Sequence, residues 1–504
     1  MHGANETIIK CLQASGEEEQ LRSLLDFIKE GHFSSKVVVS HIADNNLVPA
    51  DILSKLLSDT ELFGYKPRPI KTILITVANL HYGGGSQSAA SLANYLSSEK
   101  DCCDKPIYKV ILVSDERPSP KDYELYPSVT RLSIAPRNKK ESYKDRADFL
   151  YGLITEEHID LVIQATIRDN DSLWDMLLCK SHPSRPAYIQ ICRTSFGSLF
   201  SNATDGNFKR RKRLYQHADA LVVLNNVDRI CWGAYSPNVW TIPNIIDIAP
   251  SLPRDTAHSH RVVWAGRITP QKQPFELIKV AKKASELLPD IRFDMIGEAD
   301  DESYNNKLKS EIEKQGLENH VFLLGHHTDM AEQYSNDDIF VHTALYEGFC
   351  RVIYEAAAHA LPIVMYKIPG LDYKEHLPEI IECNQKEYEQ MAHEIVDLLT
   401  NHNKYAETSA AIVNQLTSFQ NWNQIKEWQR LFNYLEKCDK APREYGKDEV
   451  NQAVDSLVFY HYEKLQRTAS RTTSAQGKRN IKKVLKAFLI SIRGVHSLLH
   501  KKSK

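Results

Sequence analysis

The sequence lacks any run of about 18 consecutive apolar residues, so no membrane-spanning helix is expected. Its first residues, MHGANETIIK, lack the charged start, apolar run and cleavage site of a signal peptide. Its nine cysteines include no C-x-x-C pair, and their number is odd. We therefore expect reduced thiols in the cytoplasm rather than a disulfide framework.

Two nucleotide-binding motifs and any histidine-based metal motif are also missing. Neither G-x-G-x-x-G nor G-x-x-x-x-G-K-[ST] occurs, which excludes the dinucleotide fingerprint and the phosphate loop. No spacing among the 20 histidines suggests a metal site. We therefore expect neither a metal nor a cofactor.

Net charge is small but unevenly distributed. With 63 Lys plus Arg and 65 Asp plus Glu, the net charge of −2 argues against a protein built around nucleic acid. Residues 476–504 nevertheless carry nine basic and no acidic residues, which leaves −11 for residues 1–475. Apolar residues in this tail recur at helical spacing, so a basic amphipathic helix on the inner membrane surface is expected. The alternative is a helix that packs on the body of the protein.

Short apolar runs alternate with helical patterns, which predicts two successive parallel sheets covered by helices. Expected strands of the first sheet are 73–78, 109–114, 161–165, 188–192 and 220–224. Expected strands of the second are 261–265, 291–296, 321–324, 339–343 and 362–365. The expected division is a helical N-terminal extension (1–66), two Rossmann-like domains (67–252, and 253–436 with a closing helical stretch at 404–435) and a C-terminal extension (437–504). In such a pair the natural ligand site is the cleft between the domains.

Three groups of residues carry the expected chemistry. Gly83-Gly84-Gly85 lies between a strand and a helix, where glycine lets a ligand approach the backbone. Arg267 and Lys272 share a loop after a strand and can converge on a diphosphate. Glu347 precedes a helix and Glu355 lies within it, so they could contact a sugar and ribose hydroxyls.

This combination resembles the retaining GT-B glycosyltransferases of the glycosyltransferase family 4 type. It consists of a strand and Gly-rich turn, Arg-x-x-x-x-Lys, and Glu-Gly-Phe with a second Glu eight residues after the first. Residues 218–224 resemble the last strand of the family's first domain, and residues 242–247 its Pro-Asn-Gly-x-Asp interdomain signature. The resemblance covers roughly residues 70–435.

The resemblance implies a nucleotide-sugar donor held mainly by the second domain, and transfer with retention of anomeric configuration. Arg267 and Lys272 would hold the diphosphate, and Glu355 would bind ribose. Glu347 would contact the donor sugar. Further implied donor-binding residues are Gly84, Gly85, Gly297, His327, Gly348 and Phe349. The leaving phosphate would serve as base, without a metal.

One departure concerns the acceptor. Many relatives have a His where this chain has Arg193, and a guanidinium stays protonated, so it is a poor general base. Arg193 could still bind a sugar or phosphate. The expected acceptor is a lipid-linked or cell-surface glycan, and residues 1–66 could bind a partner protein. Two alternatives are a nucleotide-sugar 2-epimerase and a non-catalytic partner subunit.

Overall fold

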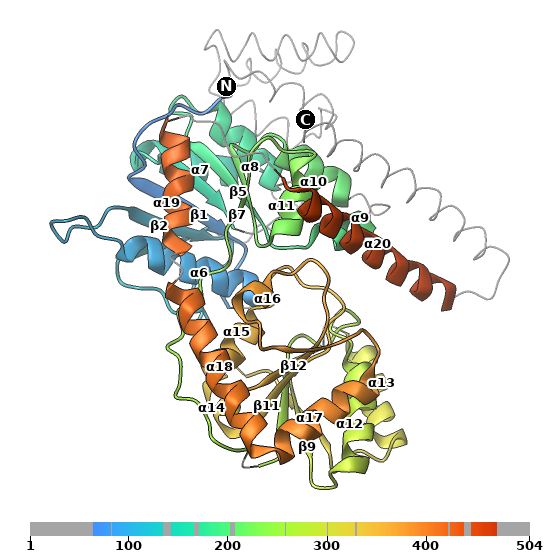
Figure 1. Ribbon diagram of the computed structural model, residues 1–504. Coiled ribbons are helices and arrows are strands. Elements are labelled where there is room, and N and C mark those ends of the chain that lie inside the picture. The colour runs from blue at the N-terminus through green and yellow to red at the C-terminus, as the bar shows by residue number, and fades with distance from the viewer. Residues whose placement is uncertain are drawn as a thin grey trace. The chain divides into compact units, whose positions relative to one another are not determined.

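The computed structural model describes residues 64–81, 83–134, 143–165, 171–201, 207–257, 259–299, 301–327, 330–421, 424–437 and 445–470. Nearly all of the expected N-terminal extension (1–66) and all of the expected basic helix (476–504) lie outside them. The chain divides into two compact units (Figure 1). Unit 1 is Met1–Ile242 with Ile425–Lys504, and unit 2 is Pro243–Gln424. None of the described helices combines the length and the apolar character needed to cross a membrane.

Unit 1 is built on a parallel sheet whose order is β3-β2-β1-β4-β5-β6-β7. The five expected strands of this sheet are confirmed, because each is a buried run of apolar and β-branched residues. Two further strands, β3 and β7, close its edges. The strands are β1 Thr72–Val77, β2 Lys109–Ser114, β3 Val129–Ser133, β4 Leu161–Gln164, β5 Ala187–Cys192, β6 Ala220–Val223 and β7 Val239–Thr241.

Helices cover this sheet, and one hydrophobic core joins it to α7, α8, α9, α10, α11 and α20. Figure 1 shows α20 in dark red beside α9 and α11, where a β-carbon on Gly197 would overlap the ring of Tyr460. The helices are α6 Gly83–Ser98, α7 Tyr143–Glu156, α8 Asp171–Ser181, α9 Phe196–Ser201, α10 Asn207–Tyr215, α11 Asn226–Gly233, α19 Gln424–Lys437 and α20 Lys447–Ser470.

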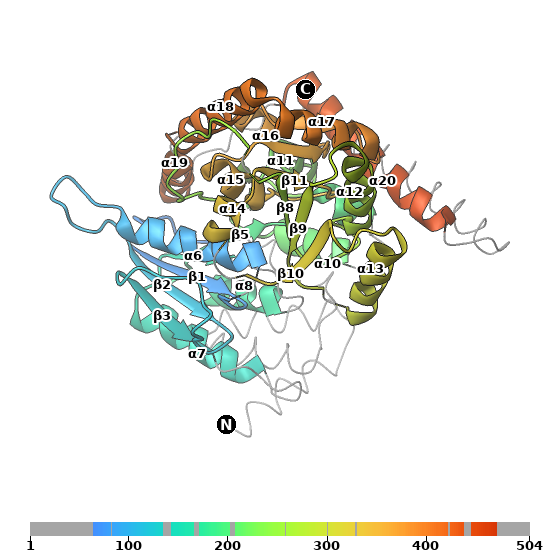
Figure 2. The same ribbon diagram turned by 90° about the horizontal axis from the view of Figure 1, so that it is seen from below.

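Unit 2 repeats the architecture with a parallel sheet of order β10-β9-β8-β11-β12-β13. Figure 2 shows α12 and α13 on one flank of this sheet and α14 and α15 on the other. Its strands are β8 Arg261–Ala265, β9 Arg292–Ile296, β10 Val321–Gly325, β11 Ile339–His342, β12 Ile363–Tyr366 and β13 Ile381–Cys383. Its helices are α12 Pro274–Leu287, α13 Glu302–Lys314, α14 Ala331–Asn336, α15 Arg351–Ala358, α16 Tyr373–His376, α17 Tyr388–Thr400 and α18 His402–Asn421.

The expected closing helical stretch, 404–435, differs from the structure. It consists of two helices, of which α18 belongs to unit 2 and α19 to unit 1. Packing explains the assignment of α19. The ring of Phe432 meets Tyr108 edge-on at 5.5 Å, and Glu436 accepts a hydrogen bond from the backbone N–H of Ile70. Unit 2 therefore ends at Gln424 rather than at residue 436, and it begins at Pro243 rather than at residue 253.

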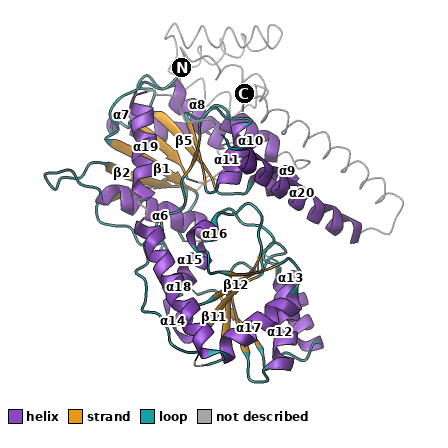
Figure 3. Ribbon diagram, in the orientation of Figure 1, coloured by secondary structure: helices purple, strands orange, loops and turns teal. Residues whose placement is uncertain are grey.

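Strand order locates a switch point in each sheet. In unit 2, β8 connects outward to β9, whereas its other neighbour, β11, connects outward to β12. Figure 3 shows β11 and β12 among the strands of this sheet, drawn in orange. Open α/β sheets bind their ligands at such a switch point, beyond the carboxyl ends of the strands, which here are the ends of β8 and β11. The loops that follow these two strands carry Lys272 and Glu347.

Candidate functional site

Hydrogen bonds tie the loops after β8 and β11 to each other. The backbone N–H of Leu345 donates to the carbonyl of Gln271 at 2.8 Å, and the Gln271 side chain donates to the carbonyl of Tyr346 at 2.8 Å. The hydroxyl of Thr343 donates to the carbonyl of Lys272 at 2.8 Å. Side chains on these loops are therefore held in a fixed relation.

Lys272 and Glu347 form an ion pair across the two loops. The Lys272 ammonium lies 2.6 Å from Oε1 of Glu347, and each side chain is 13% exposed. A pair with this little solvent exposure is screened far less than a surface pair. Both residues were predicted to bind the donor, but their direct contact was not.

Each member of the ion pair shifts the pKa of the other so that both stay charged. Burial acts to raise the pKa of Glu347, but the Lys272 ammonium and His342 bring that pKa down to about 2. Burial likewise acts to lower the pKa of Lys272, but the Glu347 carboxylate raises it above its usual value. At neutral pH the site therefore presents an ammonium and a carboxylate side by side, and Glu347 is not a proton donor.

Glycines let the backbone segments at the strand ends approach closely. A β-carbon on Gly297 would lie 1.9 Å from the carbonyl oxygen of Gly266, and the φ of Gly297 is +146°. The N–H of Gly297 donates to the carbonyl of Gly325 at 2.7 Å. The backbone segments that follow β8, β9 and β10 are therefore packed so closely that a residue with a side chain does not fit at position 297.

Glu355 is buried but already has a partner. Its Oε1 accepts a hydrogen bond from Nε of Arg351 at 2.9 Å. Arg351 also donates to the carbonyl of Ile245 at 2.8 Å and lies 3.6 Å from Asp247. A ribose bound there would therefore share Glu355 with Arg351.

The other predicted donor residues lie near these strand ends or on the loop after β11. Arg267 is exposed on the loop after β8, and His327 is half-buried after β10. Gly348 and Phe349 follow Glu347, and the Phe349 ring stacks on Tyr354 at 4.6 Å. The donor-binding roles of these four residues stay predictions.

In unit 1 the predicted residues Gly85 and Arg193 meet. A β-carbon on Gly85 would lie 3.6 Å from Cδ of Arg193, whose Nε donates to the carbonyl of Ala165 at 3.0 Å. The three glycines form the first turn of α6 rather than a loop before it, and no atom lies within 4 Å of a β-carbon placed on Gly84. The Arg193 guanidinium therefore lies near the amino end of α6, where positive partial charge gathers.

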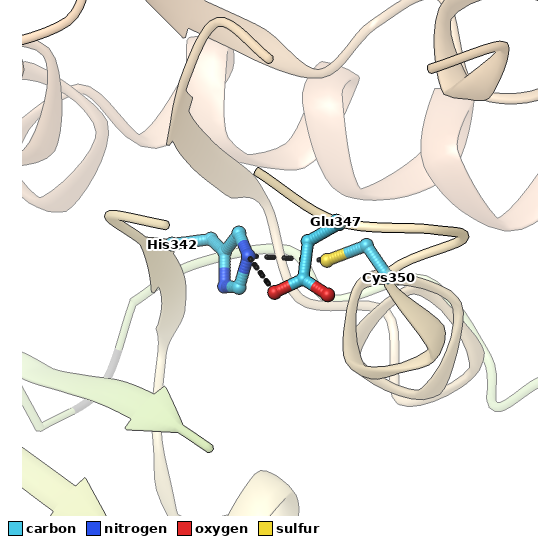
Figure 4. Close-up of side chains that lie close together, drawn as sticks. All are labelled: His342, Glu347 and Cys350. Atoms are coloured by element: carbon cyan, nitrogen blue, oxygen red, sulfur yellow. Dashed lines mark hydrogen bonds and ion pairs between the residues drawn. The ribbon is translucent and has the colours of Figure 1, made fainter. Parts of the chain in front are cut away.

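Two residues of the site were missed. His342, at the end of β11, is fully buried, and its Nε2 lies 3.6 Å from Glu347 Oε1 and 3.2 Å from Cys350 Sγ (Figure 4). Cys350 precedes α15 with a φ of 63°. In the sequence His342 sits in an apolar strand and is typical of a core position, and no local pattern marked Cys350.

The architecture is that of the GT-B fold, and a solved structure shares it. A mutant of TarM from S. aureus, solved with fondaparinux, alpha-GlcNAc-glycerol and UDP, matches with a TM-score of 0.59 at 14% identity. The match covers 72% of this chain and 100% of that one. At this identity the likeness shows the fold alone.

Within unit 2 the sequence matches a family model. Residues 257–415 match the family described as Glycosyl transferases group 1. A UDP-Gal:alpha-D-GlcNAc-diphosphoundecaprenol alpha-1,3-galactosyltransferase of Escherichia coli is 32% identical over 30% of this chain and 43% of its own length. The poly(glycerol-phosphate) alpha-glucosyltransferase of Bacillus subtilis is 21% identical over 43% of this chain and 32% of its own length. The chain spans less than half of the length of each of these relatives.

Proposed function

We propose that this chain is a retaining glycosyltransferase of the family 4 type, which moves a sugar from a UDP-sugar to a lipid-linked or cell-surface glycan without a metal cofactor. The observation that carries the proposal is the buried Lys272–Glu347 pair at the switch point of unit 2. The Lys272 ammonium suits the charged diphosphate of such a donor, and the neighbouring Glu347 carboxylate suits the hydroxyl groups of its sugar.

Lys272 and Arg267 would receive the diphosphate. When the bond from the anomeric carbon to the diphosphate breaks, negative charge grows on the phosphate oxygens. A fixed ammonium stabilises that charge without having to reorient. Lys272 is prepared for this because Glu347 keeps it charged and hydrogen bonds hold its loop.

Glu347 would act as an acceptor of hydrogen bonds from donor-sugar hydroxyls. Its carboxylate is ionised at neutral pH, so a role as general acid is disfavoured. The backbone of Gly348 and Phe349 would contact the same sugar, and Glu355 would bind ribose beside Arg351. The departing phosphate would take the proton of the acceptor hydroxyl, so no protein base is required.

The proposed donor and acceptor classes follow from the names of relatives and from unit 1. The names of two relatives specify a diphosphoundecaprenol-linked sugar and a glycerol-phosphate polymer, both of which are anionic acceptors. Arg193 and the amino end of α6 would suit such an acceptor in unit 1. Residues 476–504 would bring the protein to the inner face of the plasma membrane.

The test is nucleotide release by the purified full chain from a panel of UDP-, GDP- and ADP-sugars, with and without a membrane extract. We expect release from one UDP-sugar, stimulation by the extract, and loss of both in Glu347→Gln. The anomeric configuration of the product, read by NMR, tests retention. Donor binding without release would indicate a non-catalytic subunit, and an epimerised sugar nucleotide would indicate a 2-epimerase.

A further inference from the structure

Three side chains of different chemistry converge at the carboxyl end of β11. They are His342 on the strand, Glu347 in the loop and Cys350 before α15 (Figure 4). One ligand atom from each lies within 4.8 Å of the others. His342 is fully buried and Cys350 nearly so, whereas Glu347 is partly open to solvent.

The two spacings to His342 are close to those of a tetrahedral cation site, and the third, between Cys350 and Glu347, is within 4.8 Å. His342 Nε2 lies 3.2 Å from Cys350 Sγ and 3.6 Å from Glu347 Oε1. With Zn–S near 2.3 Å and Zn–N or Zn–O near 2.0 Å, tetrahedral ligand atoms lie about 3.3 Å (N to O) and about 3.5 Å (N to S) apart. One thiolate, one imidazole and one carboxylate form a ligand set for Zn²⁺ rather than for Mg²⁺ or Ca²⁺.

The backbone at Cys350 adds a separate observation. Its φ of 63° is in the left-handed region, where a β-carbon is disfavoured and glycine is preferred. Cysteine nevertheless occupies this position, and the conformation places its sulfur against His342. Strain of this kind accumulates at functional positions.

Lys272 opposes a bound metal directly. Its ammonium lies 2.6 Å from the same Glu347 Oε1 that a metal would need. Two cations cannot share this oxygen at close range without strong repulsion. Occupation by a metal therefore requires Lys272 to leave Glu347.

We propose that His342, Glu347 and Cys350 bind a thiophilic divalent cation of the Zn²⁺ class, and that the bound cation displaces Lys272 from Glu347. The cation replaces the thiol proton of Cys350, which is released to solvent, and water fills the fourth position. Metal and donor sugar then exclude each other, because both use Glu347 and donor binding needs Lys272 in place. This inhibitory role rests on the proposed function, but metal binding itself does not.

The test is a Cd²⁺ titration of the full chain, followed by the ultraviolet charge-transfer absorption of the cadmium–thiolate bond. The exposed neighbours Cys102 and Cys103 could also bind Cd²⁺, as could Cys11 and Cys438, which lie outside the described residues, so all four are first changed to Ser. In this background we expect one Cd²⁺ per chain, with a thiolate band that Zn²⁺ removes by competition.

Two variants make opposite predictions. Cys350→Gly relieves the left-handed strain, so it should fold, and it should lose the band and weaken binding at least about tenfold. Lys272→Ala removes the competing cation and should tighten Cd²⁺ binding several-fold, although it weakens the donor site. A band that persists in Cys350→Gly, or Cd²⁺ binding that Lys272→Ala does not strengthen, overturns the proposal.

Failure of the metal proposal is separable from failure of the proposed function. The band reports metal binding even if no sugar nucleotide is ever turned over. If the donor test succeeds, Zn²⁺ should raise the apparent KM for the donor in the wild type but not in Cys350→Gly. Equal inhibition of both proteins would place the inhibitory metal elsewhere.

Discussion

The carbonyl oxygen of Gly266 occupies the space in which a β-carbon on Gly297 would lie, 1.9 Å away. The contact joins the ends of β8 and β9 beside Lys272, whose Cε would lie 3.2 Å from a β-carbon on Gly266. Backbone on both sides leaves no flexible side chain that could yield. The structure of the candidate donor site therefore depends on glycine at position 297 as well as on its charged residues.

Gly297→Ala is expected to lower the free energy of unfolding of unit 2 by about 3 kcal/mol or more, because overpacking and an unfavourable φ combine. Urea unfolding followed by circular dichroism measures it. Gly152→Ala is the matched control, since its β-carbon would meet only Glu156 at 3.9 Å inside α7. That control should gain about 0.5–1 kcal/mol. Equal, small effects would contradict the close contact.

Lys272→Ala should weaken binding of the donor by about 1.5–3 kcal/mol, the usual loss for a charge-assisted hydrogen bond. Arg267→Ala should act in the same direction. Calorimetric titration with the donor found by the panel measures both. Lys282→Ala, an exposed lysine on α12, serves as control. Wild-type affinity in Lys272→Ala would remove Lys272 from the donor site.

Arg193→Ala should lower the rate of transfer to an acceptor more than it lowers donor affinity, because Arg193 lies near the amino end of α6 in unit 1, where the acceptor is proposed to bind. The readout is kcat and KM for acceptor and donor separately, with the exposed Arg117→Ala as control. An equal loss of donor affinity would assign Arg193 to the donor instead. Full activity would leave it without a catalytic role.

Asp337 should make stability depend on pH near neutrality. Burial and the Asp294 carboxylate raise the pKa of Asp337 from 3.8 to about 7. Between these values the folded chain holds a proton that the unfolded chain has lost. The stabilisation is therefore full below pH 3.8 and is lost as the pH rises through about 7, by at most about 1.4 kcal/mol per unit.

Asp337→Asn cannot lose this proton, so its melting temperature should rise relative to wild type between pH 6 and pH 8. Differential scanning at both pH values measures the change. Glu318→Gln, at an exposed position, is the control and should follow the wild type. Parallel curves for wild type and Asp337→Asn would show that the carboxyl is already ionised at pH 6.

Removal of residues 476–504 should release the protein from vesicles that contain anionic lipids. The reason is the loss of nine basic residues together with an apolar helical stripe. Cosedimentation at two salt concentrations measures it, since the electrostatic part weakens as salt rises. Unchanged sedimentation of the truncated chain would contradict membrane binding through this segment.

Strands with buried apolar runs could be predicted from the sequence, and so could the edge strand β10, whereas the edge strands β3, β7 and β13 could not. The run at β2 was predicted with the bounds that the structure gives. The edge strand β3, Val129–Ser133, has only one fully buried residue, and β13 has three residues. Neither is long or apolar enough to stand out from a loop.

The sequence predicted which types of residue form the site but not which of them contact each other. Lys272 and Glu347 stood out because a cation and a carboxylate followed predicted strands. Their pairing depends on the adjacency of β8 and β11, which strand order sets and sequence does not display. His342 was missed because a histidine among apolar residues is typical of a core, and Cys350 because its conformation is invisible in the sequence.

The discontinuity of unit 1 has a consequence for biosynthesis. The chain leaves unit 1 at Ile242, builds all of unit 2, and returns at Ile425. The helices α19 and α20, in which Phe432 and Leu457 are buried, are synthesised only after all of unit 2. Unit 2 can thus finish folding while unit 1 still has an open core. A premature stop shortly after Gln424 would therefore damage the amino-terminal half of the molecule and spare the half made just before it.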